Sequence, residues 1–135
     1  MKLFGRREAP DAGRGSLADY DYDLRPKKTD VVIRAAESDP HQDEIRRTLD
    51  LDADELFAMI TRRSQQDEAV DAPMPVRLFG GGRVSGVVGI VPRGMEAPVD
   101  ETIGRLLGSP NPRIPVEIAT TKNGLRVDLL IGRTR

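Results

Sequence analysis

The sequence predicts an α+β protein whose C-terminal part is a small β-rich domain, either barrel-like or an open antiparallel sheet, with one packed helix. Three observations predict this class: an acidic stretch with helical spacing before residue 73, glycine-containing hairpin patterns after it, and a helical pattern between the hairpins. We therefore expect a disordered N-terminal arm over residues 1–28, a strand plus an acidic helical hairpin over residues 29–72, and a β-rich domain with two hairpins over residues 73–135.

The composition limits the function classes that fit. Because the 135 residues include no cysteine and a single histidine, a disulfide framework, thiol catalysis and the common zinc sites are excluded. The N-terminus has no apolar stretch of signal-peptide length, and no segment reaches the roughly 18 apolar residues of a membrane span. We therefore expect a cytoplasmic protein that has no membrane partner.

The N-terminal arm is predicted to be disordered because it holds few aliphatic side chains beside several glycines and prolines. Such a segment buries too little apolar surface to offset the conformational entropy lost on ordering. Its Asp–Tyr run over residues 19–23 has two interpretations, a solvated tail or a short motif that docks on a basic partner surface.

A short β-branched segment over residues 29–36 is typical of a strand or of an extended arm laid on the later sheet. After it, Asp39 followed by Pro40 favours the start of a helix. This helix presents Ile45 and Leu49 one turn apart.

A second helix is predicted over residues 53–64, because Asp52 and Glu55 have the spacing at which two side chains cap a helix start reciprocally. The apolar run Leu56–Ile60 would cover one broad face of this helix. The two helices then form a helical hairpin, and residues 65–74 form a polar linker.

The β-rich domain begins with a hairpin in which residues 76–79 and 84–91 flank a glycine turn over residues 80–83. A helix should follow from about residue 97. Its inward side chains are predicted to be Val99, Ile103, Leu106 and Leu107, with Gly108 just past its end.

The last hairpin is predicted to have a two-residue type I′ turn at Asn123–Gly124. This turn pairs Thr120 with Val127 and Ile118 with Leu129, which gathers the aliphatic residues on one face.

No pattern in the sequence supports catalysis. The alternating acids at 50, 52 and 54 lack the glycine at 55 and the glutamate at 61 that a calcium loop needs, and capping explains them better. The glycine cluster at 80–82 is followed by a strand pattern rather than a phosphate-binding helix, and neither His41 nor Ser85 has a catalytic sequence context. We therefore predict no catalytic residue, no metal ligand and no cofactor, and expect that the protein is not an enzyme.

Charge is distributed unevenly along the chain. Residues 37–72 carry 4 basic and 11 acidic side chains, whereas residues 73–135 carry 9 basic and 5 acidic ones. Either the two stretches face each other, or the basic one contacts phosphates, with arginine suited to bidentate contacts. The predicted nucleic-acid-binding residues are Arg77, Arg83, Arg93, Arg126 and Lys122. Since Phe79 is the only aromatic residue of this stretch, base stacking has almost no platform there.

Residues 83–93, followed by a helical pattern and by strands, resemble the second half of HIRAN domains. In that family a Val-Gly-Tyr-Leu-Pro-Arg type motif precedes a helix, and residues 88–93 stand here in the same order, with Ile90 in place of the tyrosine. The resemblance covers at most residues 76–131. It implies a small β-barrel-like module that engages DNA, often at single-stranded ends, with Arg93 as the contact residue.

Two functional hypotheses follow. The first is a non-enzymatic binding module that contacts nucleic acid, preferably single-stranded DNA, through arginines of the C-terminal domain. The alternative is a protein–protein interaction or assembly module, in which the acidic helices dock on a basic surface of this or another chain and the edge strands pair, including by self-association.

Overall fold

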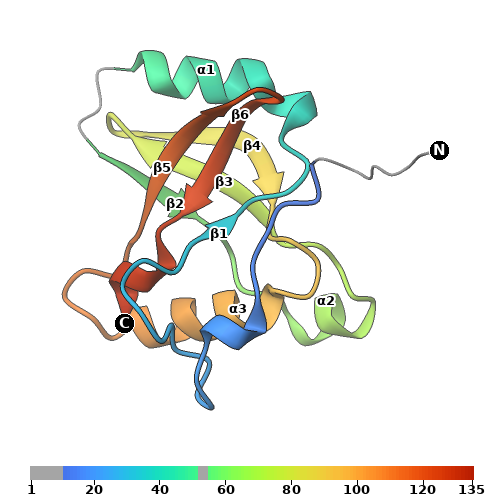
Figure 1. Ribbon diagram of the computed structural model, residues 1–135, viewed down its shortest axis with the longest axis vertical. Coiled ribbons are helices and arrows are strands. Elements are labelled where there is room, and N and C mark those ends of the chain that lie inside the picture. Colours follow the sequence, from blue (N-terminus) through green and yellow to red (C-terminus); the bar gives the residue numbers. More distant parts are fainter. Residues whose placement is uncertain (1–10, 52–54) are drawn as a thin grey trace.

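A computed structural model describes residues 11–51 and 55–135 and confirms the α+β class. One antiparallel sheet of six strands, in the order β1-β6-β5-β2-β3-β4, curls into a half-barrel (Figure 1). The strands are β1 (Ile33–Arg34), β2 (Leu56–Met59), β3 (Pro75–Gly80), β4 (Arg83–Ile90), β5 (Ile114–Thr121) and β6 (Gly124–Leu129). The helices are α1 (Gln42–Asp50), α2 (Gln65–Ala69) and α3 (Glu96–Leu106), with 3-10 turns η1 (Leu17–Asp19), η2 (Asp39–His41) and η3 (Ile131–Thr134).

The core lies inside the curl of the sheet. Alternate residues of the strands point inward and are fully buried, among them Ile33, Leu78 and Val127. Helix α1 crosses one end of the half-barrel and α3 the other, as Figure 1 shows, and each inserts a fully buried side chain, Ile45 and Val99 respectively. The two helices thereby cover both ends of the core.

The two edges of the sheet meet at one bridge. Ala36, just after β1, exchanges two backbone hydrogen bonds of 2.8 Å with Ile90 of β4. A side chain at Gly89 would place its Cβ 2.7 Å from the Ala36 carbonyl oxygen, so glycine is required for this close approach. The bridge therefore holds the curl closed at this point.

The helix predicted over residues 53–64 is wrong, because residues 56–59 form the strand β2 between β5 and β3. Leu78 and Val116, the cross-strand partners of Ala58 and Leu56, are buried, whereas Met59 on the other side is exposed. A short continuous apolar run fits either a helix or a strand by periodicity, and here pairing with two neighbouring strands decides. Strands from both sides of the expected boundary at residue 73 therefore share one sheet, and the predicted helical hairpin does not form.

The predicted linker over residues 65–74 contains the short helix α2. A capping box begins it, in which the Ser64 hydroxyl accepts from the Asp67 amide and the Asp67 carboxylate accepts from the Ser64 amide. The observed capping pair thus begins at Ser64, the last residue of the predicted helix. Asp52 of the expected pair lies outside the described residues.

Residues 11–28 have a defined structure, contrary to the predicted disorder of the arm, while residues 1–10 of that arm lie outside the described part. Tyr20 is 5% exposed and belongs to the hydrophobic core. Arg14 forms an antiparallel bridge with Arg34 of β1, and Tyr20 forms one with Pro26. The segment is ordered because it packs on the sheet, a long-range contact that its own composition does not reveal.

The first hairpin confirms the predicted glycine turn, since Gly81 and Gly82 have φ values of +57° and +74°. The predicted register of the last hairpin is wrong, because Thr120 pairs with Leu125 and Ile118 with Val127. In this turn Gly124 alone has a positive φ, so the I′ turn at residues 123–124 does not form. Both registers put the same side chains on the inner face, and the hydrophobic pattern does not distinguish them.

Helix α3 begins close to the predicted residue and buries Val99 and Leu106. Leu107, which was expected to point inward, is 70% exposed because the helix ends at Leu106. In α1 only Ile45 of the expected pair is buried, and Leu49 is exposed at the helix end.

Candidate binding face on strands β2 and β3

The structure separates the five predicted nucleic-acid-binding residues. Arg126 is 3% exposed. Its Nη2 donates to Asp39 Oδ1 at 2.7 Å, and its Nε lies 3.4 Å from Asp11 Oδ1. The backbone carbonyls of Asn123 and Leu125 accept further hydrogen bonds from the same guanidinium. Arg126 is therefore a structural cation and is not available to an external phosphate.

Arg93, the residue suggested by the resemblance to HIRAN domains, is also held by carboxylates. Its guanidinium lies 2.8 Å from Asp71 Oδ2 and 3.4 Å from Glu96 Oε2, and it donates to the Asp71 backbone carbonyl. Hydrogen bonds from Arg63 and then from Arg93 lower the pKa of the Asp71 carboxyl. This mutual arrangement fixes Arg93 near the start of α3.

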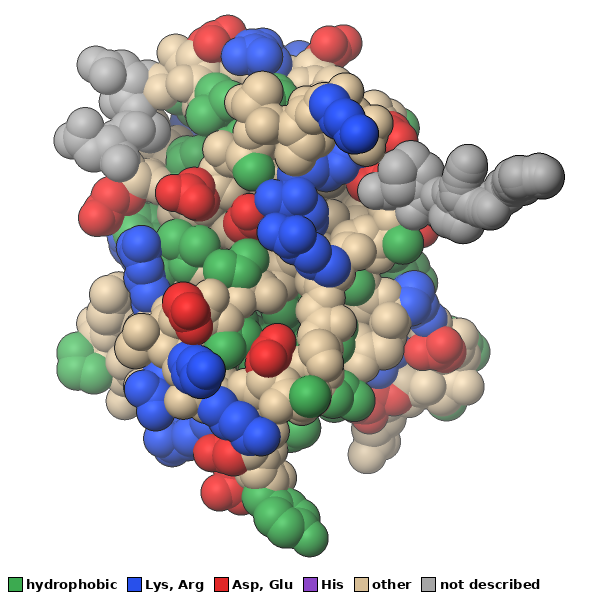
Figure 2. Space-filling view, in the orientation of Figure 1, with side chains coloured by type: hydrophobic (Ala, Val, Ile, Leu, Met, Phe, Trp, Pro, Cys, Tyr) green, Lys and Arg blue, Asp and Glu red, His purple; other side chains and the backbone are tan. Residues whose placement is uncertain are grey.

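Arg77, Arg83 and Lys122 are exposed but lie on different parts of the surface. Arg83 follows the β3–β4 turn and lines a small pocket with residues of α1, Lys122 lies in the β5–β6 turn, and Arg77 lies within β3. Figure 2 shows basic side chains in several separate groups with acidic side chains among them. The arginines selected from the sequence do not form one continuous basic patch.

A different cluster forms on the outer side of the sheet, where Phe57 of β2 and Phe79 of β3 are direct cross-strand partners. Arg113, just before β5, places its guanidinium carbon 4.8 Å from the centroid of the Phe57 ring and 5.7 Å from that of Phe79. These distances are in the range of a cation–π interaction. With Met59 and Arg77, the next cross-strand pair along the same side, these residues form what we name the β2–β3 face.

The β2–β3 face combines exposed apolar atoms with cations. Met59 is 44% exposed, and Val84, which pairs with Phe79 from β4, is 52% exposed. Within residues 11–51 and 55–135, neither Arg77 nor Arg113 forms an ion pair with a carboxylate. The face therefore differs from the surroundings of Arg93 and Arg126, where acids neutralise the guanidinium groups.

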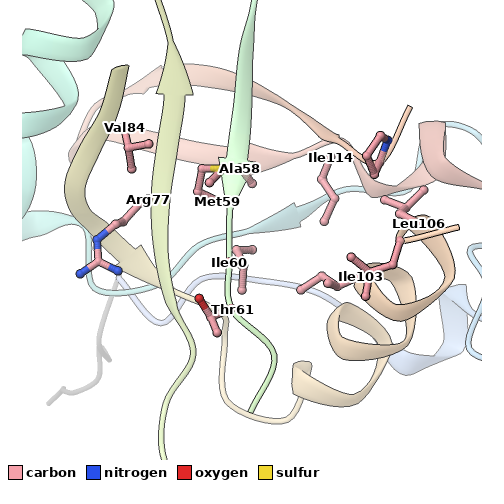
Figure 3. Close-up of a pocket in the computed structure, with 11 residues that line it drawn as sticks. Ala58, Met59, Ile60, Thr61, Arg77, Val84, Ile103, Leu106 and Ile114 are labelled. Carbon is pink, nitrogen blue, oxygen red and sulfur yellow. The ribbon is translucent and has the colours of Figure 1, made fainter. Parts of the chain in front are cut away.

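A groove of about 360 Å³ adjoins this face (Figure 3). One side is formed by Met59, Arg77 and Val84, and the other by α3 and its C-terminal end, where Ile103 and Leu107 line it. The lining is mainly apolar, with the Arg77 guanidinium at its margin. A ligand that contacts the β2–β3 face can thus place an apolar group in the groove.

Phe57 was not among the predicted site residues because its apolar run was predicted to be a helix, which left Phe79 as a solitary aromatic residue. Residues 56–59 carry a signal of their own, since a strand places Leu56 and Ala58 on one side and Phe57 and Met59 on the other. Only the pairing with β3 brings the two rings together.

The edges of the sheet, which the alternative hypothesis requires to be free, are largely occupied. On β4 the Gly86 amide donates to Glu44 Oε2 of α1 at 2.7 Å, and Ile90 pairs with Ala36. On β1 the residue Arg34 pairs with Arg14. These contacts leave little backbone for an added strand.

In the described ranges, no group of three His, Asp or Glu side chains lies close enough together to hold a metal ion. The helices of the same ranges include none with the length and apolar character needed to cross a bilayer.

Comparison with known proteins does not identify a relative: no family model matches the chain, and neither curated proteins nor solved structures give a significant match. The resemblance to HIRAN domains therefore stays a prediction, and the geometry of the β2–β3 face carries the functional argument.

Proposed function

We propose that this protein is a non-enzymatic binding module that holds single-stranded nucleic acid, preferably DNA, across its β2–β3 face. The observation that carries the proposal is the cross-strand pair of Phe57 and Phe79 with the Arg113 guanidinium over both rings. Aromatic side chains beside arginine on a sheet surface are typical of single-strand binding, because every base has a face that stacks.

The charges of the face support the same ligand. Arg113 lies over the two rings, and Arg77 belongs to the next cross-strand pair. In the described part of the chain neither arginine forms an ion pair with a carboxylate, so both can contact a phosphate, while Glu55 and Glu117 line a separate pocket beside Phe57. Arginine binds phosphate oxygens through two parallel N–H groups, and its planar guanidinium also stacks on bases. A single strand can present bases to the rings and phosphates to the arginines, whereas a duplex keeps its bases stacked inside.

A second candidate is docking of a protein partner on the same face. Met59, Val84 and Leu107 are exposed apolar side chains around the groove, and exposed apolar clusters mark interaction sites in many proteins. In this reading the groove receives an apolar side chain of the partner, and the edge strands and α1 take no part.

The decisive experiment is a titration of the protein with a fluorescently labelled, unstructured oligonucleotide, followed by anisotropy at about 50 mM and about 200 mM salt. Binding is expected at the lower concentration, and log K should fall by about 0.7 per unit of log salt for each phosphate contact. Phe57→Leu, which keeps an apolar side chain but removes the aromatic ring, should weaken binding about tenfold. Arg113→Gln should reduce the salt slope by about 0.7.

Arg46→Gln is the matched control, because Arg46 is exposed on α1, away from the β2–β3 face. A duplex of the same sequence should bind more weakly than the single strand. Absence of binding at the lower salt concentration, or equal losses in the Arg46 and Arg113 variants, contradicts the nucleic-acid proposal. If light scattering shows a molecular mass that rises with protein concentration, and Met59→Ser abolishes this rise, the protein-docking candidate is favoured.

A further inference from the structure

A second pocket, of about 690 Å³, lies at the opposite side of α3 from the groove and is lined by arginines from three separate elements. Arg105 comes from α3, Arg62 from the segment after β2, and Arg25 from the loop between η1 and β1. The carboxylates of Asp23 and Glu101 also line it. Neither carboxylate forms an ion pair with any of the three arginines among the described residues.

Arg105 has donor groups without a partner. Its Nη1 donates to the backbone carbonyl of Thr134, but its Nε and Nη2 are buried and have no hydrogen-bond partner within the described chain. Burial, and then the neighbouring Arg25, lower the pKa of this guanidinium, although an arginine stays charged at neutral pH. A buried cationic donor that lacks an acceptor is unfavourable, so an anionic acceptor at this edge would stabilise the fold.

The unpartnered edge of Arg105 is the one that other arginines of this protein use to hold oxyanions. Arg34 binds the Asp128 carboxylate through Nε and Nη2, at 2.7 and 3.0 Å. Arg62 binds the Asp100 carboxylate through the same two atoms, at 3.0 and 2.8 Å. This fork matches two oxygens of a carboxylate or a phosphate.

Arg62 is held in place over a glycine. Asp100 fixes its Nε and Nη2, and its Nη1 lies where a side chain at position 104 would be, because a Cβ on Gly104 would be 2.6 Å from it. Glycine is unfavourable inside a helix, and the close approach of the Arg62 guanidinium explains why position 104 of α3 is a glycine. Arg62 therefore presents Nη1 beside the pocket in a defined position.

We propose that this pocket binds a phosphate group, with the Nε and Nη2 atoms of Arg105 as the main donors and Arg25 and Arg62 as further cations. A phosphate suits the site better than a carboxylate because its oxygens point in several directions, and the three guanidinium groups come from three elements. The proposed β2–β3 face does not enter this argument. The phosphate is either free in solution or the terminal phosphate of a nucleic-acid strand.

The loop over residues 21–25 forms one side of the pocket. Its backbone hydrogen bonds, in the described chain, are with residues 19–25, and the Asp21 carboxylate accepts from the amides of Asp23 and Arg25. Tyr22 at its tip is fully exposed. Because these hydrogen bonds are local, a shift of the loop that gives a phosphate access to Nε and Nη2 of Arg105 would break no hydrogen bond of the sheet.

The test is an NMR titration of the ¹⁵N-labelled full chain with sodium phosphate at constant ionic strength, following the arginine Nε–H signals. The Arg105 signal is expected to shift and to saturate. Arg105→Lys keeps the charge but removes the fork, and Gly104→Ala displaces Arg62. Each should weaken phosphate binding about tenfold, and Arg25→Gln, on the exposed loop, several-fold. Arg46→Lys is the matched control and should bind as the unaltered protein does.

Two further comparisons make the outcome unambiguous. Phe57→Leu should bind inorganic phosphate normally, so failure of the nucleic-acid proposal leaves this one standing. The same oligonucleotide is then compared with and without a 5′-phosphate. Tighter binding of the phosphorylated form, with a difference that Arg25→Gln removes, identifies a strand end as the source of the phosphate. Equal binding of the two forms identifies free phosphate as the ligand. Shifts that do not saturate, or that are the same in Arg25→Gln and the control, overturn the proposal.

Discussion

The outer surface of β6 and β1 and the β2–β3 face belong to the same sheet, yet their arginines do different things. On β6, the carboxylates of Asp39 and Asp11 hold Arg126. On β1, the carboxylate of Asp128 holds Arg34. On the β2–β3 face, Arg113 lies over two aromatic rings. On the first surface the guanidinium groups are neutralised by carboxylates, and on the second neither Arg77 nor Arg113 has a carboxylate partner among the described residues.

The difference teaches that an arginine on a strand is not by itself a binding residue. What decides is whether a carboxylate from a distant part of the chain reaches it, as Asp39 reaches Arg126 across 87 residues. The acidic stretch and the basic stretch partly neutralise each other in this way. The cations that remain without such partners are then the candidates for external anions.

The largest expected effect contrasts Arg126 with Arg113. Arg126→Gln should lower the free energy of unfolding by about 3 kcal/mol. The reason is that the Asp11 carboxylate and the backbone carbonyls of Asn123 and Leu125 would lose the guanidinium group that they contact. Arg113→Gln should change it by no more than about 1 kcal/mol, the size of an exposed cation–π contact. Urea unfolding followed by circular dichroism measures both. Equal losses in the two variants would remove the distinction between the surfaces.

Sequence reasoning predicted what local chemistry determines. The glycine turn of the first hairpin, the helix α3 and the β-rich class depend on nearby residues and were predicted correctly. The strand β2 was missed because a four-residue apolar run takes its structure from the strands it pairs with.

The candidate site was less predictable than the fold. Among the residues selected for nucleic-acid binding, Arg77 lies on the β2–β3 face, while Arg126 and Arg93 are occupied by acids far along the chain or in the next helix. The partnership of Phe57 with Phe79 depends on a strand pairing between residues 22 positions apart. Local patterns hold no information on such pairings.

The second prediction concerns the bridge between Ala36 and Ile90 that joins the two edges of the sheet. In Gly89→Ala the new Cβ would lie 2.7 Å from the Ala36 carbonyl oxygen and 2.9 Å from Ser38 Oγ. Because backbone has to move to relieve this contact, the free energy of unfolding should fall by about 1–3 kcal/mol. Faster hydrogen exchange at the Ala36 and Ile90 amides should accompany the loss. Gly108→Ala is the control, because a Cβ at position 108 would meet open space. Gly82→Ala is less suitable, because Gly82 has a φ of +74°.

The third prediction concerns the N-terminal segment, which pairs with β1 through Arg14 and places Tyr20 in the core. The hydroxyl of Tyr20 is buried without a hydrogen-bond partner among the described residues, so Tyr20→Phe should raise the free energy of unfolding by about 1 kcal/mol at neutral pH. Burial, and then Asp19, raise the pKa of Tyr20 above its usual value of 10.0. A raised pKa stabilises the fold below about pH 10, and this contribution decreases as the pH rises further. The phenylalanine variant should therefore lose less stability above pH 10, and a destabilised variant at pH 7 would contradict the argument.

The smallest expected effect tests whether acids truly set the behaviour of Arg93. Arg63 and Arg93 lower the pKa of Asp71 below its usual 3.8, so the ionised form is favoured in the folded state. The resulting stabilisation is fully present above about pH 4 and is lost as the pH falls through the lower pKa of the folded state. Asp71→Asn should therefore be slightly less stable than the unaltered protein at pH 7, and the difference should vanish near pH 2. Thermal unfolding between pH 2 and pH 7 measures it, with Asp43→Asn, on the exposed side of α1, as the control. A difference in stability that persists at pH 2 would mean that the neutral Asp71 carboxyl stabilises the fold through its hydrogen bonds. The contrast between arginines with and without carboxylate partners would then have no electrostatic basis.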